Sequence, residues 1–186
     1  MDARIIKTKN KIKESLIQLL QTKKLNEVSI SEICKKAKIN RNTFYAHFAT
    51  PEAALDEIAE NYLSEEYALL NQCSTSKELV ITACKYTKQN AKLNLLLLEN
   101  RALKEFVNSG VEYARRTPAY VILNQDERYS LKEMDQINTF IVNGSVAIIK
   151  NWLYDGMKES PEEIGELVDR INTSLINGLN LTQKNR

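Results

Sequence analysis

Four occurrences of one short pattern constrain the fold more than any other feature of the chain. In each, a Ser or Thr is followed three residues later by Glu, which is the capping-box signature of a helix start. Apolar residues at helical spacing follow each occurrence. Only five Gly and three Pro occur among 186 residues, which suits long helices. We therefore predict an all-α protein, with helix starts after Ser29, Thr75, Ser130 and Ser160.

The hydrophobic periodicity predicts where these helices lie. Thr50 and Ser160 each precede a proline, which fits the first position of a helix because its missing N–H costs little there. The strongest periodicity lies in the last two predicted helices. The predicted helices cover residues 3–22, 30–37, 41–48, 51–70, 76–90, 92–100, 101–116, 131–155 and 161–180.

Charge is distributed unevenly along the chain. Residues 1–50 hold eleven Lys or Arg against four acidic residues, a net charge of +7, whereas the remainder carries −5. A basic segment on an acidic body suggests that the basic segment binds a polyanion. A lysine-rich helix face that is merely solvated explains the same charge, and the count alone does not separate the two.

The segment AKINRNTFYAHF, from Ala37 to Phe48, indicates a helix-turn-helix. Two short predicted helices meet at a tight connection around Lys38 and Asn40, and Ile33 and Phe44 have the spacing needed to pack the helices together. In such a motif the second helix enters the major groove by its N-terminal end. We expect Asn40 to cap this second helix.

The residue types at that end suit DNA. Arg pairs with guanine and Asn with adenine by two hydrogen bonds each, so Arg41 and Asn42 are expected to contact bases. Hydroxyl, phenol and imidazole groups can contact phosphates, as can the amide ends of helices. A structural histidine remains the alternative for His47, and Phe44 and Phe48 are expected in the core. The expected DNA-binding residues are Ser29, Lys38, Asn40, Arg41, Asn42, Thr43, Tyr45, His47 and Thr50.

The stretch VSISEICKKAKINRNTFYAHFATPEAAL resembles the DNA-binding domain of the TetR/AcrR family of transcriptional regulators. The most specific part is Thr43, Phe44 and Tyr45 followed by His47 and Phe48. The resemblance implies a three-helix DNA-binding domain over residues 1–50 and a connecting fourth helix over about 51–70. It also implies a helical domain over 71–186 that dimerises and often holds a small-molecule inducer.

Two residues depart from the family pattern. Lys38 stands where the family usually has Gly in the turn, so either this lysine accepts an unusual backbone angle or the turn shifts. Pro51 stands where the family tends to have a Lys that often contacts phosphate. Both departures bear on DNA affinity and on the list of contacts.

The C-terminal half offers weaker expectations. The helices predicted at 131–155 and 161–180 could pack against a second copy as a four-helix bundle. Aromatic and amide side chains could line a ligand pocket, although ordinary core packing also explains them. The candidate pocket residues are Phe106, Tyr113, Tyr120, Phe140, Asn143 and Trp152.

Together these features predict a dimeric repressor that binds double-stranded DNA sequence-specifically, at a near-palindromic operator. A small-molecule inducer would release the repressor from the DNA. The alternative is a partner- or metabolite-dependent co-regulator with weak DNA binding of its own. An enzyme is poorly supported, because the single His47 has no nucleophile pattern around it and no glycine-rich phosphate loop is present. We expect no cofactor and no metal. The three cysteines, the absence of a signal-like segment and the short apolar runs favour a cytoplasmic, non-membrane protein.

Overall fold

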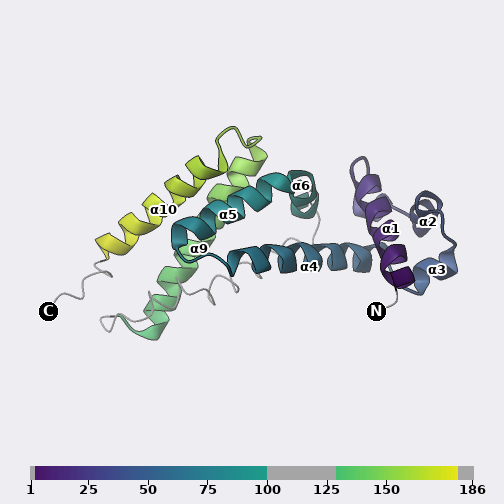
Figure 1. The fold of residues 1–186 in the computed structure, drawn as a ribbon, viewed down its shortest axis with the longest axis horizontal. Helices are drawn as coiled ribbons and strands as arrows, with labels where there is room; N and C mark the ends of the chain where they lie inside the picture. The colour runs from purple at the N-terminus through teal and green to yellow at the C-terminus, as the bar shows by residue number, and fades with distance from the viewer. Residues whose placement is uncertain (1–2, 100–128, 180–186) are drawn as a thin grey trace. The chain divides into compact units, whose positions relative to one another are not determined.

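The computed structural model describes residues 3–99 and 129–179, and every regular element within them is helical (Figure 1). The prediction of an all-α fold is confirmed. The predicted helix at 101–116 lies outside the described residues. The helices are α1 (Ala3–Leu20), α2 (Ile30–Ala37), α3 (Arg41–Tyr45), α4 (Pro51–Leu70), α5 (Ser76–Gln89), α6 (Ala91–Glu99), α9 (Leu131–Tyr154) and α10 (Pro161–Gly178), with a 3₁₀ turn, η1, at Leu25–Glu27.

All four predicted capping boxes form. In α2, the hydroxyl of Ser29 accepts a hydrogen bond from the Glu32 amide, and the Glu32 carboxylate accepts one from the Ser29 amide at 2.9 Å. The same reciprocal pair opens α5, α9 and α10. Each box satisfies donors that a helix N-terminus otherwise leaves unpaired.

Most helix limits lie within two residues of the prediction, but α3 is shorter than expected. It ends at Tyr45 rather than at residue 48. The His47 amide donates to the Phe44 carbonyl three residues back at 2.9 Å, which tightens the last turn. Thr50 then has to cap α4, and its hydroxyl accepts from the Ala53 amide at 3.2 Å. The η1 turn was not predicted.

The described chain forms two compact units that divide α4 between Ser64 and Glu65. The first unit holds α1, η1, α2, α3, the greater part of α4, and α6 from Lys92 onward. These units divide the chain differently from the functional domains expected over 1–50 and 71–186, whose limits remain a prediction. The core of the first unit contains fully or almost fully buried side chains from four helices, two of them from α1: Ile12, Leu16, Ile33, Phe44 and Leu55.

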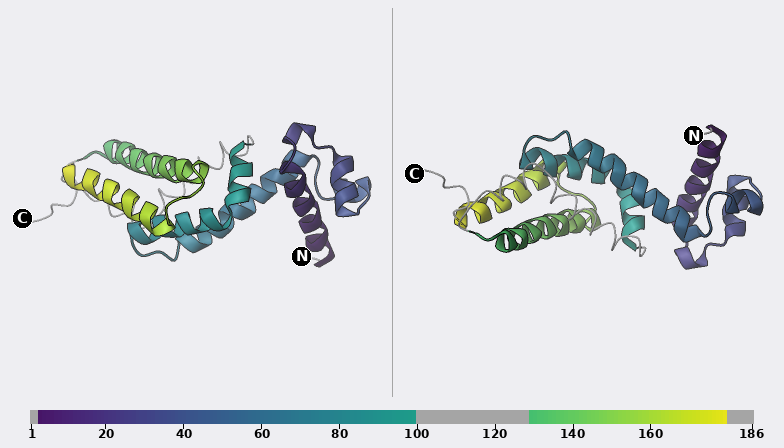
Figure 2. Two further views of the ribbon diagram at one scale, coloured as in Figure 1. Left: turned by 90° about the horizontal axis from the view of Figure 1, so that it is seen from above. Right: turned by 90° about the horizontal axis from the view of Figure 1, so that it is seen from below.

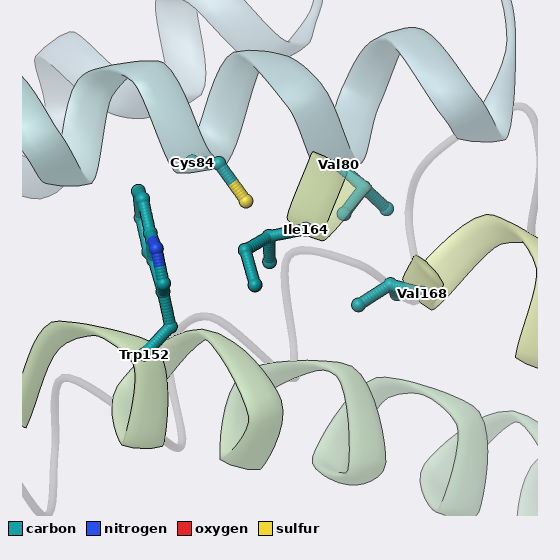
Figure 3. Packing of buried hydrophobic residues seen from close by; sticks show 5 residues of the cluster. All are labelled: Val80, Cys84, Trp152, Ile164 and Val168. Carbon is teal, nitrogen blue, oxygen red and sulfur yellow. The ribbon is translucent and has the colours of Figure 1, made fainter. Parts of the chain in front are cut away.

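The second unit contains the end of α4 together with α5, α9 and α10. Helices α5 and α10 lie side by side (Figure 2). A cluster of buried side chains joins α5, α9 and α10 (Figure 3). A Cβ added at Gly165 of α10 would lie 2.3 Å from the Ile81 side chain, so the close approach to α5 depends on that glycine. The cluster consists of Val80, Cys84, Trp152, Ile164 and Val168.

Two further features of the described chain bear on the expectations above. Cys34, Cys73 and Cys84 are free thiols, and Cys34 and Cys84 are buried. In the segments 3–99 and 129–179, none of the helices combines the length and the hydropathy that a membrane span requires.

Candidate DNA-binding surface

The turn between α2 and α3 is built around Lys38. This residue adopts the left-handed conformation, with φ 55° and ψ 47°. Its amide and that of Ile39 both donate to the Cys34 carbonyl, the latter at 3.0 Å, so the turn closes the end of α2. The lysine therefore accepts the unusual backbone angle and the turn does not shift. A side chain in this region costs on the order of 1 kcal/mol.

Asn40 caps the N-terminus of α3, as predicted. The Asn40 side-chain oxygen accepts from the Thr43 amide at 2.7 Å and from the Thr43 hydroxyl at 2.9 Å. This cap orders the first turn, where the expected base-contacting residues lie. It also means that Asn40 and Thr43 already use polar groups within the helix.

Helix α3 has one buried side and one exposed side. Phe44 is 0% exposed, whereas the neighbouring Tyr45 is 56% exposed. Their rings meet edge to face, 5.9 Å between centroids. Phe48, just beyond the helix, is also buried. The expectation that Phe44 and Phe48 belong to the core is confirmed, and Tyr45 presents its ring toward solvent.

Arg41 and Asn42 are both exposed at the tip of α3. The Arg41 guanidinium donates a hydrogen bond to the hydroxyl of Ser31 in the first turn of α2. Sequence reasoning missed Ser31, because the two residues lie ten positions apart and only the helix-turn-helix geometry brings them together. The guanidinium thus lies beside the start of α2 in this structure.

Ser29 and Thr50 are exposed and serve as helix caps. Glu32, the partner of Ser29, also accepts an ion-pair hydrogen bond from Lys23. This bond, followed by those from the Ser29 amide and hydroxyl, lowers the pKa of Glu32 to about 2. The N-terminus of α2 therefore carries a persistent negative charge close to Ser29. The Lys23 pairing was not predicted, since nothing in the linear sequence marks these residues as neighbours.

The last of the expected residues, His47, lies just beyond the C-terminal end of α3. His47 is half-buried directly before buried Phe48. No group of three or more His, Cys, Asp and Glu side chains suited to a metal ion is present within residues 3–99 and 129–179.

Three of the six candidate pocket residues fall within the described chain. Trp152 is buried in the α5–α9–α10 cluster, and its indole N–H donates to the Glu159 carbonyl at 3.1 Å. Phe140 is 69% exposed, and the amide of exposed Asn143 donates to Thr139 in the same helix. Twelve residues of helix separate Phe140 from Trp152, roughly 18 Å, so these side chains are not brought together. Phe106, Tyr113 and Tyr120 lie outside the described residues.

The fold matches solved regulators. A TetR-family transcriptional regulator from Syntrophomonas wolfei aligns over 95% of this chain and 98% of its own, with TM-score 0.72 and 19% identity. A TetR transcriptional regulator from Streptococcus agalactiae aligns over 92% and 96%, with TM-score 0.71 and 20% identity. At these identities the likeness concerns the fold, and it confirms an N-terminal helix-turn-helix followed by a helical domain.

Sequence comparison supports the same assignment. The HTH-type transcriptional regulator YvdT of Bacillus subtilis is 41% identical over 54 residues, and YxbF of the same organism is 26% identical over 109 residues. These matches span 29% and 58% of this chain, and 28% of each relative. The family profile of the TetR transcriptional regulator C-terminal region matches residues 74–174, more than half of the chain. The protein therefore belongs to the TetR/AcrR family of DNA-binding transcriptional regulators.

Proposed function

We propose that this protein is a cytoplasmic, dimeric repressor that recognises a near-palindromic operator through α3 and is released by a small molecule. One observation carries the DNA-binding part. Helix α3 buries Phe44 in the core while Arg41, Asn42 and Tyr45 face solvent. A short helix held by one side, with polar and aromatic groups on the other, suits the major groove.

The exposed residues divide into two roles. Asn42 contacts a base edge, preferentially that of adenine, and Arg41 contacts guanine. Arg41 either releases Ser31 to do so or keeps that hydrogen bond and uses its remaining N–H donors. The rest of the surface contacts phosphates and fixes the register. The phosphate contacts are Ser29, Lys38, Asn40, Thr43, Tyr45, His47 and Thr50, together with the amide ends of α2 and α4.

Dimerisation is proposed through α9 and α10. Phe140 on α9 is 69% exposed and Ile171 on α10 is 45% exposed. A Cβ at Gly144 or at Gly178 would meet nothing within 4 Å in a single copy. A second copy packed on these helices would cover the apolar side chains, and the glycines would allow close approach. Two α3 helices would then reach half-sites about 34 Å apart.

Release by a small molecule requires only that the ligand prefer a conformation that fits DNA poorly. About 1.4 kcal/mol of preference lowers operator affinity tenfold. The ligand site is assigned to the C-terminal part of the chain, as in the family pattern. The candidates there remain Phe106, Tyr113, Tyr120, Phe140 and Asn143. Buried Trp152 would support such a site through packing and would not contact the ligand.

The alternative, a partner- or metabolite-dependent co-regulator with weak DNA binding of its own, would follow if the departures at Lys38 and Pro51 weakened DNA binding. Lys38 adopts the backbone angle that the turn needs, and Pro51 occupies the first position of α4 after the Thr50 cap. Both residues fit their positions, so direct DNA binding is the better-supported proposal.

The first experiment selects bound duplexes from a randomised library with wild type, Asn42→Ala and Tyr45→Phe. Tyr45→Phe removes the hydroxyl but keeps the edge-to-face packing on Phe44, which Tyr45→Ala would lose. We expect an inverted repeat with wild type, a relaxed preference at one base pair with Asn42→Ala, worth about 1–3 kcal/mol, and uniformly weaker binding with Tyr45→Phe. No enriched sequence with wild type at low salt would refute the proposal.

The oligomeric state is tested by light scattering on wild type and Phe140→Glu. A charge on this exposed side chain should convert dimers into monomers without loss of helicity. Lys132→Glu, an exposed change on the same helix, is the matched control and should leave the dimer intact. Monomeric wild type would exclude the proposed bundle.

A further inference from the structure

Glu57 of α4 binds two lysines of α1 at once. The Lys9 ammonium lies 2.5 Å from one carboxylate oxygen, and the Lys13 ammonium lies 2.6 Å from the other. All three residues belong to the first unit. Lys9 and Lys13 are one helical turn apart, so their side chains share a face of α1.

The three groups are largely withdrawn from water. The side chain of Lys13 is 11% exposed, that of Lys9 25% and that of Glu57 28%. Burial by itself raises the pKa of Glu57, but the hydrogen bonds from Lys13 and Lys9 outweigh it and hold the pKa below its ordinary value. The carboxylate is therefore ionised whenever DNA is bound near neutral pH.

Lys9 also connects this ion cluster to the DNA-binding segment. Its ammonium lies 5.2 Å from the centroid of the Phe48 ring. Phe48 directly follows His47 and lies three residues after Tyr45, both proposed phosphate contacts. A lysine that swung away from Glu57 would thus begin its movement beside the DNA-facing segment.

Other lysines of the first unit are arranged differently. Among residues 3–64, the exposed lysines make no ion pair, apart from Lys23 with Glu32. They are available to phosphates, whereas Lys9 and Lys13 are engaged by the protein itself. In residues 3–64 these freely exposed lysines are Lys7, Lys11, Lys24, Lys35, Lys36 and Lys38.

We propose that Glu57 is a selectivity-determining residue, an internal counter-anion that withholds Lys9 and Lys13 from DNA phosphates and so limits sequence-independent binding. The proposal rests on the DNA-binding function proposed above. Non-specific affinity comes almost entirely from lysine and arginine contacts to phosphate, each of which steepens the salt dependence by about 0.9 in log K against log salt. Keeping two lysines away from the phosphates therefore weakens binding to random DNA and increases the preference for the operator.

The first test needs no DNA. Amine labelling with acetic anhydride, read by mass spectrometry, compares wild type with Glu57→Gln and Glu60→Gln. Glu60 is exposed on the same helix, so its change removes the same charge without touching the cluster. We expect labelling of Lys9 and Lys13 to rise several-fold in Glu57→Gln alone. Equal labelling in all three proteins would overturn the proposal.

The second test measures binding to a random-sequence duplex between roughly 50 and 200 mM salt, a range in which phosphate contacts make the affinity strongly salt-dependent. Glu57→Gln should bind more tightly and steepen the salt slope by about one to two. Glu60→Gln should leave the slope unchanged. The triple variant Lys9→Gln, Lys13→Gln, Glu57→Gln should return to the wild-type slope, because the released lysines are gone.

A purely structural role gives a different result. Glu57→Gln would then weaken binding to every duplex, with an unchanged slope, and this outcome would overturn the proposal. Circular dichroism checks folding, and if Glu57→Gln does not fold, Glu57→Asp replaces it, with an intermediate rise in labelling expected. Failure of wild type to select an operator would refute the proposed function, while the labelling result would still decide whether Glu57 sequesters the lysines.

Discussion

The helices of the two units are held in place by different kinds of interaction. In the first unit the two helices of the helix-turn-helix are short, and local interactions set their ends: the Ser29 and Asn40 caps and the left-handed Lys38. In the second unit capping boxes also start the helices, but these helices are longer and their fit depends on contacts distant in sequence, such as Gly165 against Ile81. These local interactions order the first turn of α3, so its polar side chains can stay exposed without being held by packing against the core.

Ion pairs differ in the same way. The side chains of the Lys9–Glu57–Lys13 cluster are mostly buried, whereas those of Lys77–Glu166 and Lys85–Glu162, which join α5 to α10, are about half exposed. Exposed pairs contribute little and are screened by salt. The exposed pairs of the second unit therefore add little to its stability, which depends mainly on its apolar cluster, whereas the ion cluster of the first unit is the one proposed above to affect DNA binding.

The largest effects should come from emptying each core. Phe44→Ala and Trp152→Ala should each cost about 3–5 kcal/mol of unfolding free energy, because each removes a buried aromatic ring. Native-state hydrogen exchange should show lost protection in α1–α3 for Phe44→Ala and in α5 and α10 for Trp152→Ala. Equal loss throughout both units in each variant would mean that the two regions unfold as one.

Two glycine substitutions should separate packed from open positions. Gly165→Ala should destabilise by about 1–3 kcal/mol, because the new methyl group meets the Ile81 side chain and its Cα lies only 3.2 Å away. Gly144→Ala should stabilise a single copy by about 0.5–1 kcal/mol, since helical Gly is unfavourable and the site is open. Urea denaturation measures both, with Gly144→Ala made in the Phe140→Glu monomer; destabilisation by Gly144→Ala in the wild-type dimer would indicate that a second copy covers that position, as proposed above.

Two residues with positive φ should respond in opposite directions to glycine. Lys38→Gly should stabilise the first unit by up to about 1 kcal/mol, because it relieves the left-handed strain of an exposed side chain. Met157, with φ 54°, packs against the apolar cluster of the second unit, so Met157→Gly should destabilise despite the same relief. Chemical denaturation of both variants tests this, and equal signs would contradict it.

The smallest effects should be opposite pH dependences. Glu32, with its pKa lowered from 4.5 to about 2, stabilises the first unit above pH 4.5, and this contribution is lost as pH falls toward 2. Burial raises the pKa of Glu66, in the second unit, from 4.5 to about 7. Its contribution is present below pH 4.5 and lost as pH rises through 7. Hydrogen exchange across pH should show both trends, and Glu32→Gln and Glu66→Gln should each abolish one.

Much of the candidate site could be predicted because its signals are local. The Asn40 cap, the strained Lys38 turn and the burial of Phe44 beside exposed Tyr45 all follow from residues a few positions apart. Contacts between residues distant in sequence could not be predicted in this way. Arg41 meets Ser31, and Trp152 lies in the apolar cluster, because helix packing rather than spacing selects these partners.

The sequence by itself determined the helices, their caps and the family, since capping, periodicity and the Thr43–Phe48 pattern act over one or two turns of helix. Only the tertiary structure decided which charged side chains form ion pairs within the protein and which remain exposed. Whether Lys9 and Lys13 face solvent or share Glu57 depends on α1 packing against a helix more than forty residues later in the chain. Electrostatic partners are chosen by distance in space, and a linear sequence does not contain that distance.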